Sequence, residues 1–188
     1  MERQGVCAEK LRGRSAGPLD VRYAECTAPS VMTWSEIADE IIANRRRRGW
    51  ASAYDLAPSL GGLLEELGEL EEAWSTTPVE DGEACVDALC DIAVYGIGAM
   101  RILGAEVVAL DAIPTERART PMIGPLLRSA GRLAKAHKSG DAGAALVAAT
   151  ELVELCILRL RDFMRDPHKE IARVVQQNAT REHTGTHG

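Results

Sequence analysis

Apolar residues recur along the chain at the spacing of an α-helix. Ile37 and Ile41 lie four positions apart. Leu63, Leu67 and Leu70 likewise follow one another at intervals of four and three. Such intervals place side chains on one face of a helix, and no segment shows the strict alternation typical of a half-buried strand. The pattern predicts six helices, over about residues 33–48, 59–74, 82–103, 122–138, 142–164 and 166–178.

Capping residues support the predicted helix boundaries. Thr33 and Glu36 have the spacing of a capping box, in which each side chain accepts a hydrogen bond from the other residue's backbone. Gly104 is suited to the left-handed position that follows a helix. Asp166 and Pro167 provide an N-cap and a proline at the first helical position. The sequence therefore predicts an all-α protein, a helical bundle.

The chain divides into an irregular arm and a helical domain. Residues 1–31 mix glycine, proline, serine and charges without a period, and are expected to form a poorly ordered arm. The helical domain is expected over 32–179, as a first half at 32–111 and a diverged repeat half at 112–179. Residues 180–188 are expected to be a flexible tail.

An internal repeat underlies the two halves. Seven residues recur unchanged 63 positions later: Pro58, Gly61, Leu63, Leu64, Gly68, Leu70 and Ala73 match Pro121, Gly124, Leu126, Leu127, Gly131, Leu133 and Ala136. This indicates a duplicated helical hairpin with a degenerate second half, in which Glu65, Glu66 and Glu69 have become Arg128, Ser129 and Arg132. Coincidence between two amphipathic hairpins is the alternative.

Charge and composition narrow the possible partners. The chain has 22 Lys and Arg against 28 Asp and Glu, a net charge of -6, which argues against a nucleic-acid footprint. No apolar run reaches the roughly 20 residues of a membrane helix, so we expect no membrane partner. The N-terminus lacks the pattern of a secretory signal, and the five cysteines show no disulfide framework. A cytoplasmic protein is expected.

Two pairs of carboxylates suggest a metal site. Glu66 and Glu69 are three apart and share a helix face, and Asp87 and Asp91 are the only charged residues between positions 84 and 100. Burying two like charges without compensation is costly, and a bound cation would compensate them. Oxygen ligands suit Mg²⁺, or Mn²⁺ as a substitute, better than Zn²⁺. The alternative for a glutamate-rich helix is a solvated face.

The spacing of these acids resembles a known family. Glu66-x-x-Glu69 followed by a helix reading from Asp87 through Asp91 to Tyr95 is similar to the MazG-like, all-α nucleoside triphosphate pyrophosphohydrolases. The resemblance covers about residues 33–104, with Asn178 near the end as a further element. It implies Mg²⁺-dependent hydrolysis of a nucleoside triphosphate to the monophosphate and pyrophosphate.

The family's metal ligands carry over incompletely. The resemblance assigns Glu66 and Glu69 to the first acidic pair and Asp91 to the last aspartate. The remaining family glutamate falls on Ala88, which is a departure from the pattern. Asp87, four residues before Asp91, is the candidate replacement because it reaches the same helix face.

An acid that is not fully committed to metal would act as the general base. Glu65 and Glu66 are the two candidates for this catalytic role.

Substrate-binding candidates lie on both sides of the acidic helices. Trp50 is similar to the family's base-stacking aromatic residue, with a helix-end Trp as the alternative. Of the four consecutive arginines that end at Arg48, we expect most to complement the helix dipole and Arg48 to contact phosphate. Asn178 and Arg181 resemble the family's terminal phosphate- or sugar-binding pair, and Asn178 also fits a helix cap. Lys169 is a further candidate.

The resemblance and the repeat also bear on assembly. Family members usually build their bundles from two or four chains, so we expect a homodimer, or a pseudo-dimer supplied by the two halves of one chain. The competing hypothesis is a catalytically degenerate bundle that only binds a nucleotide or a protein partner. A helical oligomerisation module is a third reading, and it leaves Asp87 and Asp91 unexplained.

Overall fold

The computed structural model describes residues 32–49, 55–76, 82–107, 110, 113 and 123–180. These residues belong to one compact unit, Val31–Gly188. They form six helices and no strand: α1 (Trp34–Arg47), α2 (Ala57–Thr76), α3 (Glu83–Ile102), α4 (Ile123–Ser139), α5 (Ala142–Asp162) and α6 (Pro167–Thr180). The predicted all-α class is confirmed, and each predicted helix end lies within two residues of the observed one. The arm over 1–31 and almost all of the tail over 180–188 lie outside the described residues.

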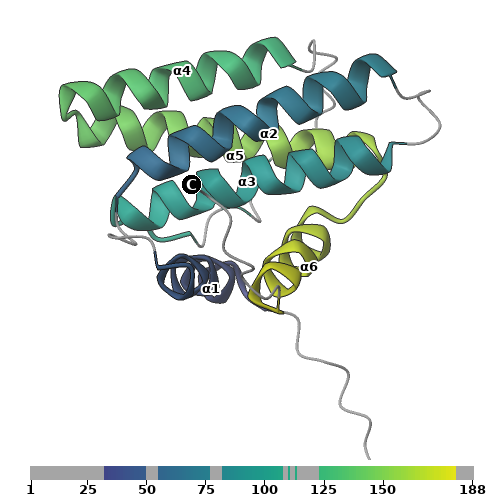
Figure 1. Ribbon diagram of the computed structural model, residues 1–188, viewed down its shortest axis with the longest axis horizontal. Helices are drawn as coiled ribbons and strands as arrows, with labels where there is room; N and C mark the ends of the chain where they lie inside the picture. The colour runs from purple at the N-terminus through teal and green to yellow at the C-terminus, as the bar shows by residue number, and fades with distance from the viewer. Residues whose placement is uncertain are drawn as a thin grey trace, which may run out of the picture. The chain divides into compact units, whose positions relative to one another are not determined.

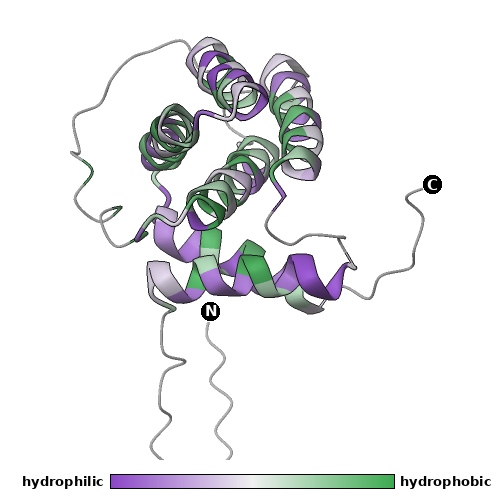
Figure 2. Ribbon diagram, turned by 90° about the vertical axis from the view of Figure 1, so that its left-hand side faces the viewer, coloured by the Kyte–Doolittle hydropathy of each residue, from purple (hydrophilic) through white to green (hydrophobic). Residues whose placement is uncertain are grey.

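The helices form a four-helix bundle with two further helices across it. Helix α3 packs against α2 and α5, and α4 packs against α5 and α2, which closes the bundle. Helices α1 and α6 lie side by side and cross the bundle at α3 (Figure 1, Figure 2). Because α3 packs against α1, α2, α5 and α6, it is the central element, and most of its residues are buried.

The capping signals act as the sequence predicts. The Thr33 backbone N–H donates to the Glu36 carboxylate at 2.6 Å, and the Glu36 N–H donates to the Thr33 hydroxyl at 3.3 Å, which completes the capping box. Gly104 has a φ of +81° after α3. The Asp166 carboxylate accepts from the backbone N–H of His168 at 3.1 Å, so it caps α6. These local bonds satisfy backbone groups that a helix end leaves open.

The two hairpins lie where the repeat places them. Helices α2 and α3 form one hairpin, and α4 and α5 form the other. Core residues also correspond at the offset of 63, with at most 2% of each side chain exposed: Leu63 and Leu126, Leu70 and Leu133, Leu89 and Leu152. Each buried leucine contributes about 1.5–3 kcal/mol to folding. Both hairpins therefore contribute equivalent residues to one core, which α1 and α6 complete.

The cysteines of the bundle are structural. Cys85, Cys90 and Cys156 are buried and free. Burial raises the pKa of the Cys90 thiol to about 12, and it also raises the pKa of Cys156. These thiols therefore pack as small apolar groups, as the sequence predicts.

Candidate functional site

A pocket of about 130 Å³ opens where α1 and α6 meet the bundle. Four helices contribute to its wall: Ile41, Asn44, Arg45 and Arg48 from α1 and its C-cap, Glu66 from α2, Asp91, Val94 and Tyr95 from α3, and Val175 and Asn178 from α6. It brings together four of the predicted site residues: Glu66, Asp91, Arg48 and Asn178. Two carboxylates and two guanidinium groups thus share one small cavity.

Arg45 lies in the last turn of α1, where a basic residue complements the helix dipole, and it also lines the pocket. Its side chain is not on a solvated face, because only 4% of Arg45 is exposed and the side chain lies over Gly98 of α3. A Cβ atom at Gly98 would overlap the Arg45 guanidinium, so glycine is required for this path. Burial lowers the pKa of Arg45 to about 10, although Tyr95 counteracts the shift. Arg45 therefore still carries its charge at neutral pH.

Tyr95 forms the part of the wall next to α2. Its ring lies against Gly62, where a Cβ atom would overlap the phenol oxygen. Burial raises the pKa of Tyr95, and the Glu66 carboxylate adds to the increase. Tyr95 follows Asp91 by four residues, so both lie on one face of α3. This spacing is the signal in the sequence that would have placed Tyr95 at the site, and the sequence-based prediction lacks it.

Asn44 joins the two crossing helices at the pocket. It is 7% exposed, and its Nδ2 donates to the Val175 carbonyl of α6 at 3.2 Å. The Arg47 guanidinium donates to the Asn44 side-chain oxygen. Asn44 thereby positions α6, and with it Asn178, against α1.

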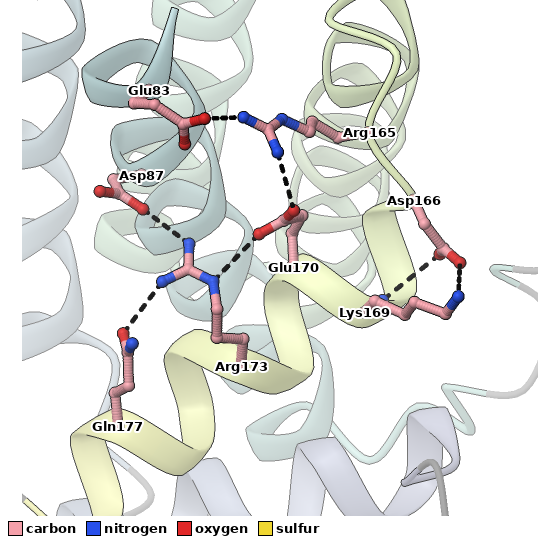
Figure 3. A network of polar contacts seen from close by, with 8 residues as sticks. All are labelled: Glu83, Asp87, Arg165, Asp166, Lys169, Glu170, Arg173 and Gln177. Carbon is pink, nitrogen blue, oxygen red and sulfur yellow. Dashed lines mark hydrogen bonds and ion pairs between the residues drawn. The ribbon is translucent and has the colours of Figure 1, made fainter. Parts of the chain in front are cut away.

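Asp87 lies outside the pocket, in a network of ion pairs between α3 and α6 (Figure 3). Arg173 Nη2 is 2.7 Å from Asp87 Oδ1, and Arg173 Nε is 3.0 Å from Glu170 Oε2. Arg165 extends the network by pairing with Glu170 and with Glu83. The prediction that Asp87 and Asp91 are buried together is wrong for Asp87. Asp87 is instead exposed, with its charge compensated by Arg173.

The remaining predicted site residues do not line this pocket. Glu65 and Glu69 lie on exposed positions of α2. Lys169 Nζ is 3.5 Å from Asp166 Oδ2 in the first turn of α6. Trp50 and Arg181 lie outside the described residues. The part of the chain that the structure describes contains no group of three or more His, Cys, Asp and Glu side chains placed to hold a metal ion.

Comparisons of the chain with protein-family models, with curated proteins and with solved structures gave no match. The resemblance to the MazG-like enzymes therefore rests on the quoted residues and their spacing. None of the described helices is long and apolar enough to cross a membrane.

Proposed function

We propose that the protein is a Mg²⁺-dependent hydrolase that converts a nucleoside triphosphate to the monophosphate and pyrophosphate. One observation carries the proposal: Glu66 and Asp91, the acids that resemble the family's ligands, line the same pocket as Arg45 and Arg48. Carboxylates hold a cation, and guanidinium groups hold phosphate oxygens. A triphosphate with its metal ion needs both kinds of group within one site.

The donor set of the pocket fits Mg²⁺. This ion is usually bound by one or two carboxylates and by phosphate oxygens, and it retains several waters. The carboxylates of Glu66 and Asp91 would hold the Mg²⁺ ion. The amide oxygen of Asn178, in the same pocket wall, would be a further oxygen ligand. When bound, Mg²⁺ would neutralise part of the phosphate charge and lower the pKa of the attacking water. Glu69 stays a predicted additional ligand.

Arg45 and Arg48 would bind the phosphates. Arg45 is held between α1 and α3, so its guanidinium needs little reorganisation when an anion arrives. Hydrogen bonds from a buried guanidinium to phosphate are strong because the surroundings have a low dielectric constant. The same donors stabilise the charge that develops on the departing pyrophosphate.

Glu66 is also our candidate for the general base, which would accept the proton of the attacking water through a carboxylate oxygen that is not bound to the cation. Of the two candidate bases, Glu66 lines the cavity and Glu65 does not. In the hydrolysis, a bond forms between the water oxygen and the α-phosphorus, and the bond to the bridging oxygen of the β-phosphate breaks. The cavity of about 130 Å³ is smaller than the roughly 300–1,000 Å³ of a typical ligand pocket. We therefore expect it to hold the reacting phosphates, with the sugar and base extending beyond it.

Nucleotide binding without turnover is a second candidate function. Ala88 replaces a family glutamate, and Asp87, its candidate replacement, is paired with Arg173 outside the pocket. The pocket would then retain its phosphate-binding arginines and a reduced metal site. The bundle would serve as a nucleotide sensor or as a protein-interaction module.

Pyrophosphate release from a panel of ribo- and deoxyribonucleoside triphosphates tests the proposal. We expect release with Mg²⁺ and none with a chelator. Glu66→Gln and Asp91→Asn should each lower turnover by about 100-fold or more, the scale of losing a general base or a charge-stabilising group. Glu71→Gln is the matched control, because Glu71 is an exposed α2 residue outside the pocket.

Three outcomes separate the candidates. Release that both pocket variants lose and Glu71→Gln keeps supports the enzyme. A nucleotide-dependent rise in the unfolding midpoint without release, lost in a pocket variant, supports the binding function. Neither release nor a rise in the midpoint with any nucleotide contradicts both.

A further inference from the structure

The charged side chains that the structure places in the pocket wall balance one another. Glu66 and Asp91 contribute two carboxylates, and Arg45 and Arg48 contribute two guanidinium groups. Burial lowers the pKa of Arg45 only to about 10, so this residue is charged at neutral pH like the other three. Taken together, the four described side chains give the wall a net charge of zero.

All four charges act on one point of the pocket, the phenol of Tyr95. Burial raises the pKa of Tyr95, and the carboxylates of Glu66 and Asp91 add to the increase. Arg48 and Arg45 act on the same phenol in the opposite direction. Because Coulomb interactions weaken with distance, a ligand in this cavity of about 130 Å³ lies within range of the acids and the bases alike.

A divalent cation by itself gains little from such a wall. The two carboxylates attract it and the two guanidinium groups repel it, while the ion also gives up part of its hydration. Arg45 has little freedom to move away, because it is 4% exposed and its guanidinium lies over Gly98 of α3. The arginines therefore oppose the binding of free Mg²⁺ to Glu66 and Asp91.

A triphosphate without a metal ion meets the opposite difficulty. The guanidinium groups of Arg45 and Arg48 attract its phosphate oxygens, whereas the carboxylates of Glu66 and Asp91 repel them. A cation between the carboxylates and the phosphates replaces this repulsion by two attractive contacts. Only the metal ion and the phosphates together complement every charge of the wall.

We propose that the pocket binds the magnesium complex of the nucleotide as one unit, and that Arg45 and Arg48 keep free Mg²⁺ from the two carboxylates. This inference rests on the function proposed above and specifies the form in which the substrate binds. The metal ion and the nucleotide are then positively coupled, so each raises the affinity of the other by the same factor.

Binding of Mn²⁺ without any nucleotide tests the role of the arginines. Electron paramagnetic resonance measures the free Mn²⁺ in a titration of the full chain. We expect weak binding by the wild type, and an affinity at least about 10-fold higher in Arg45→Met and in Arg48→Met, because each variant removes a like charge from the site. Adding Glu66→Gln to Arg45→Met should abolish the gain.

Arg46→Met is the matched control, because Arg46 is exposed on the same helix as Arg45 and does not line the pocket. Its affinity for Mn²⁺ should equal that of the wild type. A disturbed fold would weaken metal binding, so a gain in affinity cannot arise from a merely structural effect of the substitution.

The unfolding midpoint tests the coupling between metal and nucleotide. The probes are α,β-methylene analogues of ribo- and deoxyribonucleoside triphosphates, in which the bond that the proposed reaction cleaves is replaced. We expect the midpoint to rise with an analogue and Mg²⁺ together, and to change little with either one alone.

Tight binding of Mn²⁺ by the wild type without nucleotide would overturn the inference. So would arginine variants that bind Mn²⁺ no better than the wild type. Both outcomes leave the proposed hydrolysis in place. A midpoint that does not change with any analogue and Mg²⁺ would instead contradict the proposed function, and the inference with it.

Discussion

Arg45 lines the pocket at a cost to the stability of the fold. Its guanidinium is buried between α1 and α3, and burial lowers its pKa to about 10. A base whose folded pKa lies below the ordinary value of 12.5 disfavours folding while it is protonated in both states. The cost is fully present at neutral pH and diminishes only as the pH rises through about 10.

Replacing Arg45 should therefore stabilise the protein without ligand and weaken its function. We expect Arg45→Met to increase the free energy of unfolding by about 1–3 kcal/mol, because each pKa unit corresponds to about 1.4 kcal/mol. The same variant should lose the rise in unfolding midpoint that nucleotide with Mg²⁺ produces. Thermal unfolding with and without nucleotide measures both effects. Arg46→Met is the control, because Arg46 is exposed on the same helix and does not line the pocket.

Lower stability of Arg45→Met would show that the polar contacts of Arg45 outweigh its desolvation. A normal nucleotide response in that variant would remove Arg45 from the proposed phosphate site.

Helix ends show how much of the fold can be predicted from local sequence. The capping box at Thr33, the glycine at 104 and the Asp166 cap act over a few residues, so the sequence determines them directly. The buried position of Arg45 depends on Gly98, more than fifty residues away. Asp87 and Asp91 share a helix face by their spacing, but Asp87 pairs with Arg173 of α6 and Asp91 lines the pocket. Long-range packing of this kind cannot be predicted from spacing alone.

The left-handed position that follows α5 is occupied by Met164 and not by a glycine. A substitution at this position can therefore stabilise the protein. Met164 has a φ of 59°, while Gly104 and Gly140 occupy the corresponding place after α3 and α4. A left-handed backbone costs a side-chain-bearing residue about 1–2 kcal/mol. We expect Met164→Gly to increase the free energy of unfolding by about 1 kcal/mol, measured by chemical denaturation. Gly140→Ala, with a φ of 72°, should decrease it by a similar amount.

If Met164→Gly instead destabilises the protein, contacts of the Met164 side chain must exceed the backbone strain. Gly140→Ala should still decrease the free energy of unfolding in that case. Such a decrease would show that the stability of the protein does respond to backbone strain at a helix end.

At the scale of the whole molecule, α1 and α6 form a layer that is joined to the bundle mainly through α3. Contacts within the layer include the Asn44 hydrogen bond to Val175 and the edge-on packing of Trp34 against His168, with ring centres 4.7 Å apart. The link from α6 to the bundle includes the ion pair of Asp87 with Arg173. The pocket lies at this junction, so the layer carries Arg45 and Asn178 while the bundle carries Glu66 and Asp91. Binding at the site must therefore hold the layer and the bundle together.

This division predicts how hydrogen exchange is distributed. Elements with fewer buried contacts open at lower free energy, so amides of α1 and α6 should exchange faster than those of α3 and α5. Nucleotide with Mg²⁺ should slow exchange in α1 and α6 together, because it bridges the layer and the bundle. Mass spectrometry of peptides from each helix measures this. Slowing that is confined to the α4–α5 hairpin, or spread evenly over all six helices, would place the ligand elsewhere.

The Asp87–Arg173 ion pair allows the attachment of α6 to the bundle to be tested without ligand. Arg173→Gln removes the pair, and an exposed ion pair contributes at most about 1 kcal/mol, so exchange in α6 should accelerate by up to about 5-fold. Exchange in the α4–α5 hairpin should not change, because the ion pairs of Arg173 are with Asp87 of α3 and with Glu170 of α6. Lys169→Gln is the matched control, since the ion pair of Lys169 is with Asp166, the residue that caps α6. Acceleration in Arg173→Gln alone would show that α6 is fastened to the bundle through α3, which is the arrangement that brings Asn178 to the pocket.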